Sequence, residues 1–430
     1  MDRSPVRTYA PWPQARIALV AIMLALVLGA TVAAAKPQSN SSGRIVAVGD
    51  IHGAYERFAA LLREVELVDN AGHWVGGAAV LVQTGDFTDR GPGVRAVMDL
   101  LIRLQAEAAA AGGRVIVLLG NHEAMNLSGV FRDVGADAYE GFVDERSERT
   151  RDEAFREYEQ TVLRRDSSWR RASARQRREA RLAWDEEHAP GRVEYVRALR
   201  PDADYGRWLR TLPAVAEVDG FLFVHGGITP ELAPFGVRQI NERVAGEIAL
   251  LDSLRARLEQ EKKVTSFADY QELFGAIRER ADLPAGEAGR TVAEDAANRL
   301  QTNAAFDSRG IDGFRAAVAL DRWLLMGEVG PLWFRGYARW GDREGASLLR
   351  SVLEPLAAAA VVSGHTPQPG EVAVRFDGRA FLIDTGMLER VYGGRAAALE
   401  IDSARISARY LDGGREDLGA RPARAAAVGF

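Results

Sequence analysis

Short apolar runs alternate with amphipathic stretches over the first third of the chain. β-Branched runs that lead into Gly-Asp or Gly-Asn occupy residues 44–50, 78–86 and 114–123. Between them, residues 54–66 and 93–110 carry apolar side chains at helical spacing. This β-α-β-α-β order, with strands that are apolar almost throughout, predicts an α/β fold whose parallel sheet is covered on both faces.

The rest of the chain changes pattern several times. Residues 131–212 mix Arg and Glu with scattered Leu, Trp and Ala, and residues 231–330 have long amphipathic stretches, so both predict helical inserts. We interpret the first insert as a solvated cap, with a substrate-docking face as the alternative. A strand returns at 220–227, and short strands from about residue 359 predict a second, partly antiparallel sheet. The Ala/Arg-rich tail, 412–430, is expected to be loosely ordered.

The amino terminus has the pattern of an export signal. Arg residues precede an uninterrupted apolar run over residues 17–35, which ends in small residues and is followed by a polar linker at 36–43. This order predicts a signal peptide over residues 1–35 that is cleaved near Ala35. An uncleaved membrane anchor is the alternative, because the run is just long enough to span a bilayer. We therefore expect an exported bacterial protein, periplasmic or secreted, or else one anchored in the inner membrane.

Composition narrows the chemistry that the chain can perform. A formal net charge of −5 argues against a general nucleic-acid-binding surface. The chain has no cysteine, which excludes disulfides, thiolate zinc sites and a cysteine nucleophile. Any metal must therefore be held by His, Asp, Glu or Asn, and only six histidines are available.

Polar side chains collect where the predicted strands end. Asp50, Asp86 and Asn121 each follow a glycine at the end of one strand of the repeating units. In an open α/β sheet this edge is where ligands bind. Four of the six histidines also lie at strand ends: His52, His122, His225 and His365. One such histidine is usually structural, but four beside matching carboxylates predict a metal centre.

These groups suit a pair of divalent ions. Carboxylate, imidazole and amide ligands without thiolate favour Mn²⁺ first, with Fe or Zn²⁺ as alternatives. Two such ions can clamp both oxygens of an in-line phosphoryl displacement and make water a nucleophile near neutral pH. The chemistry also needs cations for the phosphate oxygens and a proton donor for the leaving alkoxide.

Five short blocks in this order resemble the signature of calcineurin-like metallophosphoesterases: "GDIHG", "GDFTDRG", "GNHE", "HGG" and "GHT". The "DRG" and "GNHE" blocks resemble the phosphoprotein phosphatase branch, and "LWFRG" with "SGHT" looks most like bacterial Shewanella-like phosphatases. The resemblance implies one catalytic domain over residues 44–411. Its fold would be a four-layer α-β-β-α sandwich with two mixed sheets, into which the helical segments are inserted.

The resemblance also implies a role for each matching residue. One ion would be held by Asp50, His52 and a bridging Asp86, and the other by Asp86, Asn121, His225 and His365. His122 would be the general acid, oriented by Asp89. Arg90 would bind phosphate, and Arg335 would be a second phosphate ligand unless it only packs over its aromatic neighbours.

Three functions remain open at the level of sequence. The leading hypothesis is a phosphomonoesterase in which a metal-bound hydroxide attacks a phosphorylated protein, a peptide or a small phosphate ester. A nucleotide or dinucleotide polyphosphate hydrolase is the alternative within the same chemistry, although Glu123 after "GNH" argues mildly against it. A non-catalytic metal-binding module is the third, and it would have no use for the proton donor His122. No nucleic-acid partner is expected, and membrane contact only if the N-terminal segment stays uncleaved.

Overall fold

The repeating units build the first of two sheets. β1 (Ile45–Val48), β2 (Val80–Gln83) and β3 (Arg114–Val117) are parallel and in register, with Ile45 opposite Val80 and Val80 opposite Arg114. On the other edge of β1, three antiparallel strands complete the order β11-β10-β9-β1-β2-β3. These strands are β9 (Ala397–Ile401), β10 (Arg405–Tyr410) and β11 (Arg415–Ala420). The computed structural model describes residues 43–284, 286, 289–291, 293–295, 311–368 and 370–423.

The second sheet has five strands in the order β4-β5-β6-β8-β7. It is also mixed, because β5, β6 and β8 run parallel while β4 and β7 pair antiparallel at the edges. The strands are β4 (Val215–Val218), β5 (Phe221–Val224), β6 (Ala360–Ser363), β7 (Ala373–Arg375) and β8 (Ala380–Leu382).

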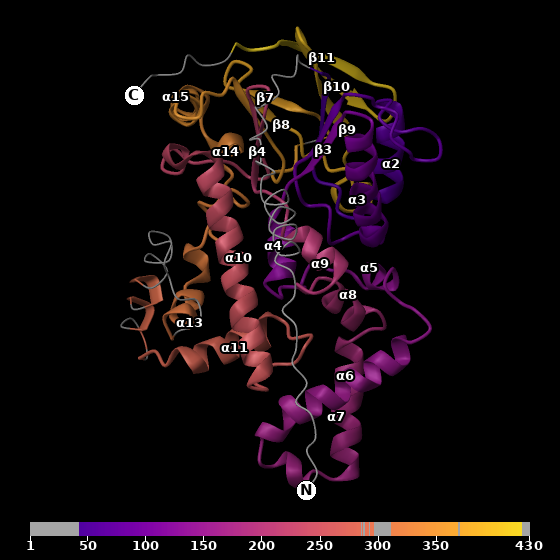
Figure 1. Ribbon diagram of the computed structural model, residues 1–430, viewed down its shortest axis with the longest axis vertical. Helices are drawn as coiled ribbons and strands as arrows, with labels where there is room; N and C mark the ends of the chain where they lie inside the picture. Colours follow the sequence, from indigo (N-terminus) through magenta and orange to yellow (C-terminus); the bar gives the residue numbers. More distant parts are fainter. Residues whose placement is uncertain are drawn as a thin grey trace, which may run out of the picture. The chain divides into compact units, whose positions relative to one another are not determined.

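The two sheets pack face to face with helices on the outside (Figure 1). Successive side chains of β1 point in opposite directions, so Ile45 and Ala47 join Phe223 and Val362 in the core between the sheets, whereas Val46 faces the helices. On that side lie α2 (Tyr55–Glu64) and α3 (Val94–Ala110), and α14 (Gly336–Arg339) and α15 (Asp342–Leu353) accompany the second sheet. The expected four-layer sandwich with two mixed sheets is confirmed.

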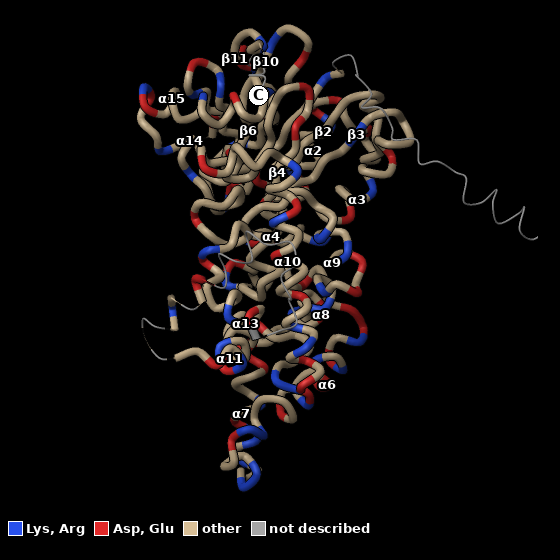
Figure 2. Tube along the Cα trace, turned by 60° about the vertical axis from the view of Figure 1, so that its left-hand side comes forward, with Lys and Arg blue, Asp and Glu red and all other residues tan. Residues whose placement is uncertain are grey.

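Most of the remaining helices belong to the two inserts. The first insert contains α5 (Ala136–Glu140), α6 (Ser147–Thr161), α7 (Ala174–Glu187), α8 (Arg192–Ala198) and α9 (Asp204–Leu209). The second contains α10 (Gly236–Gln260), α11 (Tyr270–Ala281) and α13 (Ile311–Val318). Figure 2 shows acidic and basic residues interspersed along α6 and α7, where pairs such as Arg149–Glu153 and Arg175–Glu179 join one helical turn to the next.

Two expectations about the sheets differ from the structure. The strands "AAALEI" and "RISARYL", expected in the second sheet, are β9 and β10 of the first, which is therefore mixed and not purely parallel. Both sheets bury one face in the same core, so the hydrophobic pattern cannot tell which sheet a strand joins. The tail expected to be loose from residue 412 contains β11, whose side chains are mostly exposed. Backbone pairing with β10 holds this polar edge strand, and the pattern carries no sign of it.

The predicted signal segment and most of the linker, like residues 424–430, lie outside the described part of the chain. Within the described ranges, no helix combines the length and the hydropathy that a membrane crossing requires.

Candidate metal centre and catalytic dyad

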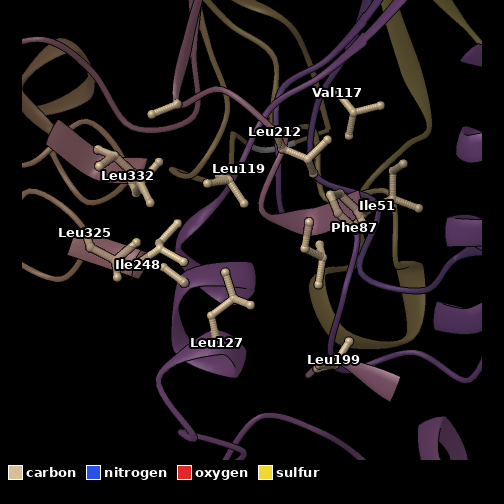
Figure 3. Packing of buried hydrophobic residues seen from close by; sticks show 14 of the residues in the cluster. Ile51, Phe87, Val117, Leu119, Leu127, Leu199, Leu212, Ile248, Leu325 and Leu332 are labelled. Atoms are coloured by element: carbon tan, nitrogen blue, oxygen red, sulfur yellow. The ribbon is translucent and has the colours of Figure 1, made fainter. Parts of the chain in front are cut away.

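The expected site residues come together at the carboxyl ends of strands from both sheets. Asp50 and His52 follow β1, Asp86 to Arg90 follow β2, and α4 (Asn121–Leu127) begins directly after the β3 segment. His225 follows β5 and His365 follows β6 of the second sheet. Neighbouring apolar residues anchor these loops: Ile51 and Phe87 lie together in the main core cluster (Figure 3).

The site loops are held in an unusual backbone conformation. A positive φ is rare outside glycine, and such residues collect at functional sites where the surroundings enforce the strain. Five of the predicted site residues have it: His52 (47°), Asp86 (55°), Asp89 (67°), Arg90 (64°) and His365 (69°).

Glu123 ties two of these loops together. Its buried carboxylate accepts the backbone N–H groups of Asp86 and Gly120 on one oxygen (2.8 Å each). The other oxygen accepts the N–H groups of Phe87 (3.1 Å) and Thr88 (2.9 Å) and the Thr88 hydroxyl (2.7 Å). Burial raises the pKa of Glu123, whereas these hydrogen bonds act in the opposite direction. Sequence reasoning used Glu123 only to separate families and missed this role.

The first group of candidate ligands gathers around Asp86. Ligand atoms of His52, Asp86 and His122 lie within 4.8 Å of one another. His52 Nε2 lies 3.7 Å from Asp86 Oδ2 and 4.0 Å from Asp50 Oδ2. All four side chains are buried. The distances bring together the three residues expected to hold the first ion, and they also place His122 beside them.

The second group shares Asp86 with the first. His225 Nε2 lies 3.3 Å from Asp86 Oδ1, 2.9 Å from Asn121 Oδ1 and 3.1 Å from His365 Nδ1. Asp86, His225 and His365 also form a group of ligand atoms within 4.8 Å of one another. The carboxylate of Asp86 thus lies between both groups, which is the position that a bridging ligand needs.

The hydrogen bonds of three of these histidines suit metal binding. His52 donates Nδ1–H to Thr88 O (3.1 Å), and His225 donates Nδ1–H to Thr84 O (3.0 Å). His365 instead donates Nε2–H to Trp333 O (3.0 Å). A carbonyl oxygen can only accept, so the second nitrogen of each ring keeps its lone pair and faces the cluster. Metal-bound histidines are usually oriented in this way.

Burial and charge set the protonation states of the cluster. Burial lowers the pKa of His52 to about 3 and that of His365 to about 2, so both rings are neutral near pH 7. Burial raises the pKa of Asp86, but the nearby rings of His225 and His122 outweigh it and the net pKa is well below the ordinary value. A neutral imidazole and an ionised carboxylate are the forms that bind metal. The donor set therefore fits two divalent ions.

Asp384 is a further acid at the site that the sequence did not single out. It follows β8 and is buried, and its carboxyl group is hydrogen-bonded to that of Asp50. Burial raises the pKa of Asp384 to about 6, and burial together with the charge of Asp384 raises that of Asp50. The block "FLIDTG" places Asp384 at a strand end as the other site residues are placed, and this was the available signal.

His122 and Asp89, the expected catalytic dyad, lie next to the candidate metal ligands. His122 Nδ1 lies 2.7 Å from Asp89 Oδ2, and His122 Nε2 lies 3.8 Å from Asp86 Oδ2. Burial acts to lower the pKa of His122, but the carboxylates of Asp86 and Asp89 raise it and the net direction is upward. Arg90 reaches the same place, with Nη1 2.8 Å from His52 Nε2.

Arg335 comes to the cluster from the segment between the second insert and α14. Its guanidinium donates to His365 O (2.8 Å) and to the Thr366 hydroxyl (3.1 Å). It is half-buried, and burial lowers its pKa below the usual arginine value. The cation–π contacts of the described residues include none from Arg335.

Comparisons with known proteins agree with this geometry. The model of the calcineurin-like phosphoesterase family matches residues 43–264. Shewanella-like protein phosphatase 2 of Arabidopsis thaliana is 32% identical over 48% of this chain and 51% of its own length. Shewanella-like protein phosphatase 1 of Plasmodium berghei is 24% identical over 80% of this chain and 67% of its own length. The chain thus spans about half the length of the Arabidopsis relative.

Among solved structures, the cold-active protein-tyrosine phosphatase of a psychrophilic Shewanella species superposes with a TM-score of 0.51. It is 22% identical, over 87% of this chain and 80% of that one, which supports the likeness of fold. The family model covers more than half of the sequence and includes the first three blocks and the "HGG" block. The chain belongs to the calcineurin-like phosphoesterase family.

Proposed function

We propose that the protein is a metal-dependent phosphomonoesterase of the protein phosphatase type. One observation carries the proposal: Asp86 is shared by two converging groups of ligand atoms, and the His122–Asp89 pair stands beside them. Two divalent ions bound there would neutralise phosphate charge and activate water near neutral pH.

The side chains of this chain supply the other requirements of phosphate ester hydrolysis. Arg90 and Arg335 approach the cluster from two directions and offer guanidinium groups to phosphate oxygens. His122 can pass the proton on Nε2 to the leaving oxygen, because Asp89 holds the opposite nitrogen of the ring. A non-catalytic module needs ligands but neither the dyad nor the arginines, so we place that alternative behind the enzyme.

The first test is hydrolysis of an aryl phosphate by the full-length chain. We expect a chelator to abolish phosphate release and Mn²⁺ to restore it, and Fe²⁺ and Zn²⁺ at equal concentration test the preference for manganese. Activity that survives exhaustive chelation would contradict the proposal.

The proposed substrates are phosphorylated proteins, peptides or small phosphate esters. A cavity of about 820 Å³ lies at the amino-terminal ends of α2 and α3, lined by residues that include Ala54, Pro92, Ala96 and Leu388. Its lining includes Gly53, the residue after His52, and Pro92, two residues after Arg90 in the sequence. The cavity thus offers room for the part of a substrate that is attached to the phosphate. For a protein phosphatase-type enzyme, we expect phosphotyrosine and phosphoserine peptides to outcompete diadenosine polyphosphate. Faster release of nucleotide than of peptide phosphate would favour the nucleotide hydrolase instead.

We also propose that the protein is exported, on the basis of the basic residues, apolar run and small residues at 1–35. Amino-terminal sequencing of the protein recovered from a bacterial host distinguishes the two forms. A new terminus near residue 36 in the periplasmic or secreted fraction indicates cleavage, and an intact terminus in the membrane fraction indicates an anchor. An intact terminus in the cytoplasm would contradict export.

A further inference from the structure

One buried hydroxyl connects the first helical insert with the catalytic dyad. Tyr195, on α8, donates its O–H to Asn126 Oδ1 at 2.9 Å. Asn126 Nδ2 in turn donates to Asp89 Oδ1 at 2.7 Å and to the backbone carbonyl of His122 at 2.8 Å. Asp89 then uses its other oxygen for His122 Nδ1. The insert thus reaches the proposed proton donor through three consecutive hydrogen bonds.

Packing alone does not explain a tyrosine at this position. The Tyr195 ring is fully buried and meets the rings of Tyr139, Phe142 and Phe131 edge to face, at 5.4, 5.0 and 6.2 Å between centroids. A phenylalanine would fill the same space. Burying a hydroxyl among aromatic rings costs free energy unless it is hydrogen-bonded, and Asn126 is its partner.

The hydroxyl completes the hydrogen bonding of the Asn126 amide. The Asp89 carboxylate and the backbone carbonyl of His122 can only accept, so they hold the amide N–H₂ toward themselves, and Tyr195 supplies the donor for the buried Oδ1. Without that donor, Oδ1 is left buried and unpaired, which destabilises this arrangement of the amide relative to others that turn it away from Asp89. The Asp89 carboxylate would then lose one of the hydrogen bonds that aim it at His122.

The same insert also holds the backbone beside Asp89. The Arg90 N–H donates to Asp133 O at 2.9 Å, and Asp137 of α5 pairs with Arg390, whose guanidinium also donates to Arg90 O. Asp89 and Arg90 both have positive φ, so this turn depends on outside contacts to keep its shape.

We propose that Tyr195 is a positioning residue, which acts through Asn126 and Asp89 to hold His122 in the orientation for protonating the leaving group. This assigns the first insert a catalytic purpose beyond solvation. The inference rests on the proposed function, because it requires His122 to be the general acid.

Leaving-group dependence tests the assignment. A dinitrophenolate departs without much protonation, whereas phenolate needs a proton from the enzyme. In the Mn²⁺-loaded full chain, Tyr195→Phe should lower kcat for phenyl phosphate by about three- to ten-fold, the effect of one hydrogen bond. For 2,4-dinitrophenyl phosphate the loss should be less than about two-fold. KM and metal content should not change.

The matched control is Tyr139→Phe, in the same aromatic cluster. Tyr139 is buried and its ring packs on Tyr195, but its hydroxyl has no hydrogen-bond partner among the described residues. This variant should keep the wild-type kcat for both esters. An equal loss for both esters in Tyr195→Phe, or no loss, would overturn the proposal.

A double-mutant cycle keeps the test decisive if the effect on rate is small. Asn126→Leu breaks the connection, so adding Tyr195→Phe should cause no further loss with phenyl phosphate. The same loss in both backgrounds would show that Tyr195 does not act through Asn126. His122→Asn distinguishes failure of the proposed function from failure of the present inference. If that variant does not lower the rate with phenyl phosphate more than the rate with the dinitrophenyl ester, the proposed role of His122 as general acid fails. If it does, and Tyr195→Phe does not, only the present inference fails.

Discussion

Replacing Glu123 by glutamine perturbs the candidate metal centre without changing any side chain that is expected to bind metal. The two carboxylate oxygens of Glu123 accept four backbone N–H groups and one hydroxyl, all buried. An amide keeps the shape of the side chain, but its N–H₂ group cannot accept. If that group replaces Oε2, the N–H groups of Asp86 and Gly120 lose their acceptor, and if it replaces Oε1, those of Phe87 and Thr88 do.

At least two buried donors are therefore left unpaired in either orientation. A buried donor without a partner costs about 1–3 kcal/mol, so Glu123→Gln should lower the free energy of unfolding by about 2–6 kcal/mol. This is a large part of the roughly 5–15 kcal/mol that separates a folded domain from its unfolded state. Asp86 is one of the residues released, so metal affinity should fall as well.

The assay is urea unfolding in the presence of a chelator, so that metal binding does not contribute to the measured stability. Glu107→Gln is the control: Glu107 also accepts a backbone N–H, from Trp74, but it is partly exposed and pairs with Arg103. Its remaining oxygen can still accept from Trp74, and exposed pairs contribute little, so we expect a loss below about 1 kcal/mol. A Glu123→Gln loss no larger than that of the control would refute the role given to this carboxylate.

Two further predictions concern charge. Asp86→Asn should lower metal content. Asp89→Asn should keep the metal and lower kcat by about 10²–10⁴-fold, because it affects only the His122–Asp89 pair. Elemental analysis measures the metal in both variants, and an equal loss of metal would contradict this division. Buried Glu247 accepts the N–H groups of Leu324 and Leu325, and burial raises its pKa to about 8 from an ordinary 4.5. The folded state then binds the extra proton, so the stability of the wild type relative to Glu247→Gln should be greatest below about pH 4.5 and fall as the pH rises through 8. Urea unfolding at intervals from pH 5 to 9 measures the difference in the free energy of unfolding between the wild type and Glu247→Gln. If this difference does not depend on pH, the fold does not hold the Glu247 carboxyl group neutral.

The sequence carried the parts of the fold that depend on local periodicity. The expected helices at 54–66 and 93–110 are α2 and α3 to within a few residues, because each has one apolar face that must meet the sheet. Which strands pair was not encoded locally. β9 and β10 join the first sheet because the outer edge of β1 needs a partner, and that choice depends on the whole topology.

Some residues of the candidate site could likewise be predicted from the sequence, and others could not. The expected ligands were visible because each is a polar residue placed directly after an apolar strand, and the structure gathers them around Asp86. Asp384 also follows a strand, whereas Glu123 lies in the first turn of α4, and each is hydrogen-bonded to a candidate ligand. Tyr195 gave no signal at all, since a tyrosine in a charged helical segment is indistinguishable from a packing residue until its hydroxyl is placed.

The residues that support the site loops are as necessary for the site as the candidate ligands themselves. Each positive-φ residue in the site loops costs about 1–3 kcal/mol and persists only where other contacts enforce it. Glu123 supplies such a contact for Asp86, Asn126 of α4 supplies one for Asp89, and the first insert supplies one for Arg90. The signature blocks alone therefore do not determine a working centre: a chain that kept every block but lost the Asn126–Tyr195 connection should retain its candidate metal ligands and lose the orientation of Asp89 and His122. On this reasoning, the charged insert, which bears no signature block, supports the catalytic site, so removing the Tyr195 hydroxyl should alter turnover whereas removing the Tyr139 hydroxyl should not.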